Sequence, residues 1–113
     1  MANTFRLINN AVMSGTANTT DALYTAGSGK TAIVLGLTLA NVHTAQVTAT
    51  VTITDTTASI VSHIIKDAPV PVGGSLEIMA GNKVVVEATD VIRVSSSVAD
   101  KISATMSIME IDV

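Results

Sequence analysis

Apolar and polar residues alternate along most of this chain, most regularly between Lys30 and Asp55. A period of two residues is typical of a half-buried β-strand. In residues 47–54, Val47, Ala49, Val51 and Ile53 share one face, and Thr48, Thr50, Thr52 and Thr54 share the other. In residues 33–40, Ile33, Leu35, Leu37 and Leu39 share one face, and Val34, Gly36, Thr38 and Ala40 the other. The latter segment is apolar or small on both faces, which favours a strand inside a sheet. We predict two long neighbouring strands joined by a turn near His43 and Thr44.

The same alternation predicts further strands over residues 2–14, 22–26, 58–66, 75–79, 83–88, 91–97 and 101–113. Turn-forming residues separate them, with a loop over 15–21 and a hairpin turn at Gly81–Asn82. Residues 67–74 hold both prolines, which cannot donate to a central ladder, so this segment lies at a sheet edge or crosses the end of the fold.

The final predicted strand contains a change of parity. Its apolar residues alternate up to Ile108, and then Met109, Ile111 and Val113 continue on the opposite face. Because a one-residue slip exchanges the two faces of a strand, we predict a β-bulge at Ile108–Met109, or a strand that leaves one surface for another there.

Eight or nine short strands with turns between them and no helical period predict an all-β fold without significant helix. The architecture we expect is a two-sheet antiparallel β-sandwich, either jelly-roll-like or Ig-like. Its length of 113 residues fits a single domain over residues 1–113. Residues 1–21 form either an N-terminal arm or an edge strand followed by a loop.

Composition changes this picture at the surface. Only 13% of residues are charged and the mean hydropathy is +0.54, whereas soluble surfaces are usually about 25–35% charged. A surface with so few charges favours self-association, so we expect partner subunits to cover part of it and the protein to be a homo-oligomer. Aromatic residues are 2% of the chain, so the core is aliphatic.

Charge and patterning also argue against several classes of partner. The net charge of −3 and the scattered basic residues do not make a nucleic-acid footprint. No apolar run reaches the roughly 20 residues that a membrane-spanning helix needs, and the first residues do not have the pattern of a secretory signal. We therefore expect no nucleic acid and no membrane as partners, and assembly in a cytoplasm. The absence of cysteine excludes disulfides and thiol chemistry.

No motif predicts catalysis, a cofactor or a metal. Gly27–Thr31 resembles the end of a phosphate-binding loop, but Tyr24 stands where its first glycine belongs, and a strand follows instead of a helix. His43 and His63 lack the spacing of metal ligands. We predict that the protein is not an enzyme. The regular row of threonines over residues 48–54 is either a flat binding face, for sugar or ice, or an ordinary sheet face that is exposed to solvent or covered by a subunit.

The whole chain resembles small virion structural proteins of tailed bacteriophages, of the marine and cyanobacterial phage type. The phrases that carry the resemblance are MANTF, LYTAGSGKTAIVLGLTLANVHT, KDAPVPVGGSLEIM, VVVEATDVIRVSSS and SIMEI. The basic run that follows the first phrase in those proteins is reduced here to Arg6.

The resemblance implies a non-enzymatic virion protein in many copies, which decorates or cements the capsid or attaches to the tail or neck. It implies capsid or tail proteins as partners and a virion location. A carbohydrate-binding adhesion module on the particle surface is the alternative. The candidate contact elements are the N-terminal arm over residues 2–13 and the proline-containing edge over residues 68–74. The candidate contact residues within them are Phe5, Leu7, Pro69, Val70, Pro71 and Val72.

Overall fold

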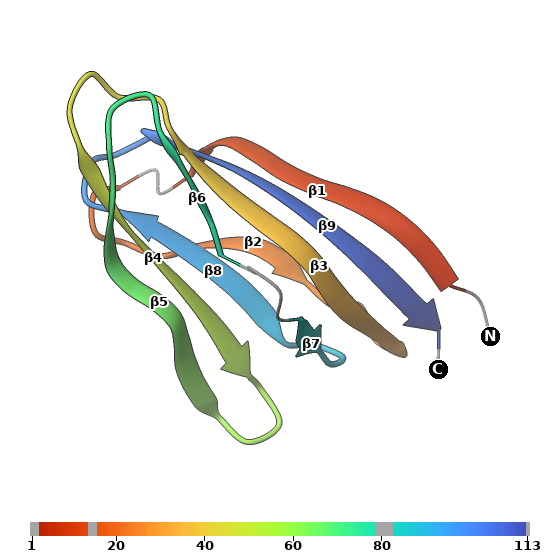
Figure 1. The fold of residues 1–113 in the computed structure, drawn as a ribbon. Coiled ribbons are helices and arrows are strands. Elements are labelled where there is room, and N and C mark those ends of the chain that lie inside the picture. Colours follow the sequence, from red (N-terminus) through yellow and green to blue (C-terminus); the bar gives the residue numbers. More distant parts are fainter. Residues whose placement is uncertain (1–2, 14–15, 79–82, 113) are drawn as a thin grey trace.

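A computed structural model describes residues 3–13, 16–78 and 83–112, and these residues form an all-β fold without helix, as predicted (Figure 1). The strands within these ranges are β1 (Asn3–Met13), β2 (Asp21–Thr25), β3 (Lys30–Asn41), β4 (Val47–Asp55), β5 (Ile60–Val70), β6 (Ser75–Glu77), β7 (Val84–Val86), β8 (Val91–Ser96) and β9 (Ile102–Asp112).

The strands form two antiparallel sheets. Sheet A has the order β1-β9-β3-β6, with β7 also paired to β3, and sheet B has the order β2-β8-β4-β5. The first four strands alternate between the sheets, which is the order of a jelly roll if β6 and β7 are two halves of one interrupted strand. An Ig-like domain keeps its first two strands in one sheet, so the topology decides between the two predicted architectures.

The two strands between Lys30 and Asp55 are present, but they are not neighbours in one sheet as predicted. β3 lies inside sheet A, between β9 and the β6 and β7 segments, and β4 lies inside sheet B. The chain crosses between the sheets just after Asn41, which is buried. The Asn41 amide donates to the carbonyl oxygens of Ala45 and Val70, and its oxygen accepts from the His43 N–H. The turn therefore joins two sheets and is not a hairpin.

A β-bulge in β3 changes which of its residues face the core. The pairing with β9 runs from Val34 opposite Ile108 directly to Gly36 opposite Ser107, which leaves Leu35 without an opposite residue. Val34 is buried before the bulge, Leu37 and Leu39 are buried after it, and Leu35 is 38% exposed. Leu37 and Leu39 therefore face the core whereas Ile33 and Leu35 do not, so the prediction that these four residues share one face is wrong.

β9 shows that the bulge predicted at Ile108–Met109 is in the wrong strand. β9 keeps one alternation throughout, with Met106, Ile108 and Glu110 buried. The irregularity lies opposite this point, at Leu35 of β3. Because the alternation continues, Met109 is only half-buried and the carboxylate of Glu110 faces the core.

β6 and β7 do not form the predicted hairpin. β6 pairs with β3 at Thr38–Ala40, and β7 pairs with the same side of β3 at Ala32–Val34. The two short strands thus follow one another along one edge. The predicted turn at Gly81–Asn82 lies outside the described residues.

The N-terminal segment and the proline-containing segment both lie at sheet edges, which is one of the alternatives predicted for each. Residues 3–13 form an edge strand rather than a free arm, and β5, the edge of sheet B, contains Pro69 before the chain crosses to sheet A. Gly73 in that crossing has φ +70, and a Cβ on Gly74 would lie 2.8 Å from Cγ of Pro71. This turn therefore requires its two glycines.

The core between the sheets is aliphatic, as the composition predicts. Its largest fully buried side chains are Met13, Leu37, Leu39, Ile92, Ile102, Met106 and Ile108, together with the valines at 34, 47, 51, 70 and 86.

Candidate assembly site

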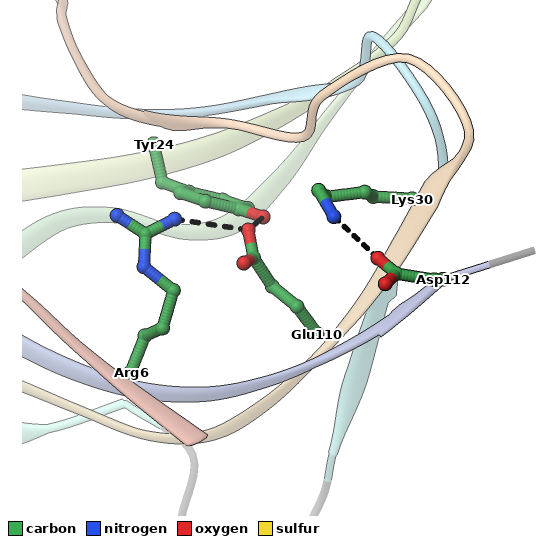
Figure 2. Close-up of polar contacts among 5 residues, drawn as sticks. All are labelled: Arg6, Tyr24, Lys30, Glu110 and Asp112. Atoms are coloured by element: carbon green, nitrogen blue, oxygen red, sulfur yellow. Dashed lines mark hydrogen bonds and ion pairs between the residues drawn. The ribbon is translucent and has the colours of Figure 1, made fainter. Parts of the chain in front are cut away.

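A polar cluster of Tyr24, Glu110 and Arg6, of which Tyr24 and Glu110 are buried, joins the two sheets at the end of the sandwich where β1 begins and β9 ends (Figure 2). Glu110 of β9 accepts a hydrogen bond from the Tyr24 hydroxyl at 2.6 Å and one from Nη1 of Arg6 at 3.0 Å. Tyr24 belongs to sheet B, whereas Arg6 and Glu110 lie on adjacent strands of sheet A. Arg6 is diagonal to Glu110 in the β1–β9 pairing, which lets its long side chain reach the carboxylate.

The three side chains fix each other's protonation. The Tyr24 hydrogen bond, followed by the nearby Arg6, lowers the pKa of Glu110 although burial acts in the opposite direction. Burial and the same carboxylate raise the pKa of Tyr24. At neutral pH Glu110 is therefore ionised and Tyr24 protonated, and the cluster attaches edge strand β1 to both sheets.

Lys30 and Asp112 form a second ion pair beside this cluster (Figure 2). They are directly opposite in the β3–β9 pairing, and both side chains are partly exposed. The carboxylate of Asp112 raises the pKa of Lys30. The Gly27–Thr31 phrase is thus a turn followed by a strand, as predicted, and its lysine pairs with a carboxylate of the same chain.

The cluster of Tyr24, Glu110 and Arg6 was not predicted from the sequence. The available signal was Glu110 itself, which follows Met106 and Ile108 at the same parity in an otherwise apolar row. The apolar residues at the other parity, Met109, Ile111 and Val113, led instead to the prediction that the two faces of this strand exchange at Ile108–Met109. A buried carboxylate instead implies a bonded partner elsewhere in the chain.

The outer face of sheet A carries an apolar strip, defined by the exposed Phe5 and Val85 at its ends and the half-buried Met109 and Ile33 between them. These residues are successive opposite partners across β1, β9, β3 and β7. Directly opposite residues share a face and lie about 4.5–5.5 Å apart at Cβ, so the four side chains form one row. Phe5 is 74% exposed and Val85 is 54% exposed. Leu7, 62% exposed, lies on the same face of β1.

The predicted contact residues fall in two separate places. Phe5 and Leu7 lie on β1 at one edge of sheet A, and the proline segment lies at the end of β5, on the opposite side of the molecule (Figure 1). Pro69, Pro71 and Val72 are exposed. Val70 is fully buried in the core, so the prediction that it is a contact residue is wrong.

The threonine row on β4 is largely occupied by contacts within the chain. Thr52 is buried, the Thr50 hydroxyl oxygen accepts from the Asp67 N–H, and Thr54 accepts from Arg93. It is therefore not an open row of hydroxyl groups.

Within the described residues, no group of three or more His, Asp or Glu side chains could hold a metal ion, and no pocket is found. None of these residues forms a helix with the length and hydropathy needed to span a bilayer. The prediction that the protein is not an enzyme stays a prediction.

Comparison with known proteins identifies a shared fold. No family model matches the chain, and no curated protein matches it. A similar solved chain is described by the words "Bacillus endospore appendages form a novel family of disulfide-linked pili". The match has a TM-score of 0.58 and 12% identity, and it covers 99% of this chain and 88% of the other. It shows the β-sandwich fold.

This match corrects the expected function. The prediction of a bacteriophage virion structural protein, with the adhesion module as its alternative, is wrong, because the similar solved fold belongs to a bacterial appendage. Capsid or tail proteins as partners are unsupported for the same reason. A likeness of folds does not test the sequence phrases that carry the phage resemblance, nor the predicted place of assembly.

Proposed function

We propose that this chain is a non-catalytic structural subunit that associates with copies of itself into a non-covalent assembly of the appendage kind. The observation that carries the proposal is the apolar strip on the outer face of sheet A, which ends at the exposed edge strand β1. Apolar surface of this kind, on a chain with so few charges, supports burial against another subunit.

The similar solved fold supports the proposal from a second direction. That protein forms pili, which contain many copies of a subunit, and its pili are described as disulfide-linked. The present chain has no cysteine, so its copies would be held by apolar contacts and backbone hydrogen bonds.

Purified protein tests the proposal. We expect sedimentation velocity to show a mass that rises with concentration, and negative-stain images to show repeating assemblies. Phe5→Ser removes the most exposed residue of the strip and should weaken association about tenfold or more, since burying one phenylalanine contributes roughly 1.5–3 kcal/mol.

Ile60→Ser is the matched control, because Ile60 is 54% exposed on β5, away from the strip. It should leave the association unchanged. A wild-type protein that stays monomeric at every concentration would refute the proposed function.

A further inference from the structure

Within the described residues, the two sheets have four edges, which differ in how well they are protected against pairing with another strand. Natural edge strands are protected by shortness, bulges, prolines or charges. β6 and β7 have three residues each, and β2 has five with a register shift between Ala22 and Tyr24. β5 is long, but its pairing with β4 is irregular at two places, and it carries Lys66, Asp67 and Pro69.

β1 is less protected than the other three edges over most of its length. From Asn3 to Asn10 it pairs with β9 in an unbroken register, and this stretch contains no proline. Its one charged residue, Arg6, is held by Glu110 on the inner side of the sheet. β1 therefore presents a long regular edge that can accept another strand.

We propose that β1 pairs antiparallel with β1 of a second copy of this chain, around a twofold axis that passes between the two Leu7 residues. The two A sheets then form one continuous sheet. This proposal rests on the proposed function and names the edge and register through which two copies meet.

Parity and charge select this register. Opposite residues of an antiparallel pair share a face of the sheet. The outer faces of the two A sheets therefore lie on the same side of the joined sheet only if one residue of β1 is opposite the same residue of the second copy, with the twofold axis between them. The central choices within Asn3–Asn10 are Arg6 opposite Arg6 and Leu7 opposite Leu7. Like charges directly opposite each other are destabilising, and two leucines are not, so the Leu7 register is favoured.

This pairing also extends the apolar strip. Leu7 of one copy lies opposite Leu7 of the other, and Phe5 of each copy is diagonal to Leu7 of the other on the same outer face. The two strips become one larger apolar surface, which is available for further association of dimers.

Charge exchange at Leu7 tests the axis. Leu7→Lys and Leu7→Glu should each weaken self-association about tenfold or more, because two like charges meet at the axis. An equimolar mixture of the two variants should form a heterodimer, which native mass spectrometry detects when one variant is labelled with nitrogen-15, because lysine and glutamate are nearly equal in mass. The matched control is the pair Val61→Lys and Val61→Glu on β5, where Val61 is 57% exposed, and no preferred heterodimer is expected.

Single cysteines test the register directly, because the natural chain has no cysteine. Under mild oxidation, Leu7→Cys should form a covalent dimer several times faster than Phe5→Cys, Asn9→Cys or the control Val61→Cys. If wild-type protein associates but Leu7→Cys is no faster than Val61→Cys and the charge variants do not exchange, this inference is overturned and the proposed function stands. A monomeric wild type refutes the proposed function itself.

Discussion

Glu110 shows how one residue sets the chemistry of this sandwich. It occupies an inward position that would otherwise hold an aliphatic side chain, and burial of a carboxylate is costly unless it is bonded. Tyr24 from the opposite sheet and Arg6 from the edge strand supply the two hydrogen bonds. The residue thus fixes where β1 lies as well as how the sheets meet at this end.

Glu110→Gln should lower the free energy of unfolding at pH 7 by roughly 1–3 kcal/mol. The substitution replaces the buried carboxylate that accepts hydrogen bonds from Tyr24 and Arg6, and Arg6 loses its partner charge. The pKa of Glu110 in the folded protein lies below the unfolded value of about 4.3. Its stabilising contribution is therefore fully present above that pH and is lost as pH falls through the folded-state pKa. Urea denaturation at several pH values should show wild type and variant converging at low pH.

Glu87→Gln, at an exposed position, is the control and should differ little from wild type at any pH. The phenolate absorbance gives an independent measurement, because Tyr24 is the one tyrosine and the chain has no tryptophan. Its midpoint should lie above the usual value of about 10 in the wild type and lower in Glu110→Gln. A gap between Glu110→Gln and wild type that is constant with pH would contradict this account.

At the scale of the element, the bulge in β3 reconciles two halves of a strand that bury opposite parities. Val34 and Leu37 are both buried because Leu35 is an extra residue without a partner on β9. The bulge places the apolar residues on both sides of it toward the core.

Deletion of Leu35 should leave the fold intact, with only a small change in the thermal midpoint. Gly36 already lies opposite Ser107, so the deletion converts the bulge into a regular ladder without moving any other pair. Circular dichroism during heating would check this.

Deletion of Thr105 is the contrasting change, since β9 is paired on both sides and has no bulge of its own to absorb a lost residue. It should shift the register with both neighbours and abolish cooperative unfolding. Equal effects of the two deletions would argue against the bulge.

At the scale of the whole molecule, the jelly roll places an apolar outer face next to a long and regular edge strand, β1. The strip runs across sheet A and ends at β1, so edge pairing and face burial act on the same side of the subunit. The edge at β5, by contrast, carries Lys66, Asp67 and Pro69, which disfavour strand addition.

Assemblies of this chain should be unaffected by reducing agents, because no disulfide can form between copies. Urea should dissolve them, because it weakens apolar contacts and solvates peptide groups. Added salt should change the affinity little, since few charges are available to be screened. Light scattering of assembled protein in dithiothreitol, in urea and in increasing sodium chloride would measure this. Dissociation by the reductant or by salt alone would contradict the proposed apolar and backbone contacts.

Strand content, the aliphatic core and the interior position of β3 followed from the sequence. Each depends on local alternation and composition, which act between residues close in the chain. The turn after Gly27 and the edge position of the proline segment followed from the same local chemistry of glycine and proline.

Only the tertiary structure decided which strands are neighbours. It placed β3 and β4 in different sheets, moved the bulge from β9 to Leu35, buried Val70 and brought Arg6, Tyr24 and Glu110 together. These features depend on pairing between strands far apart in the sequence. A period of two tells which residues share a face, but it does not tell which strand lies opposite that face.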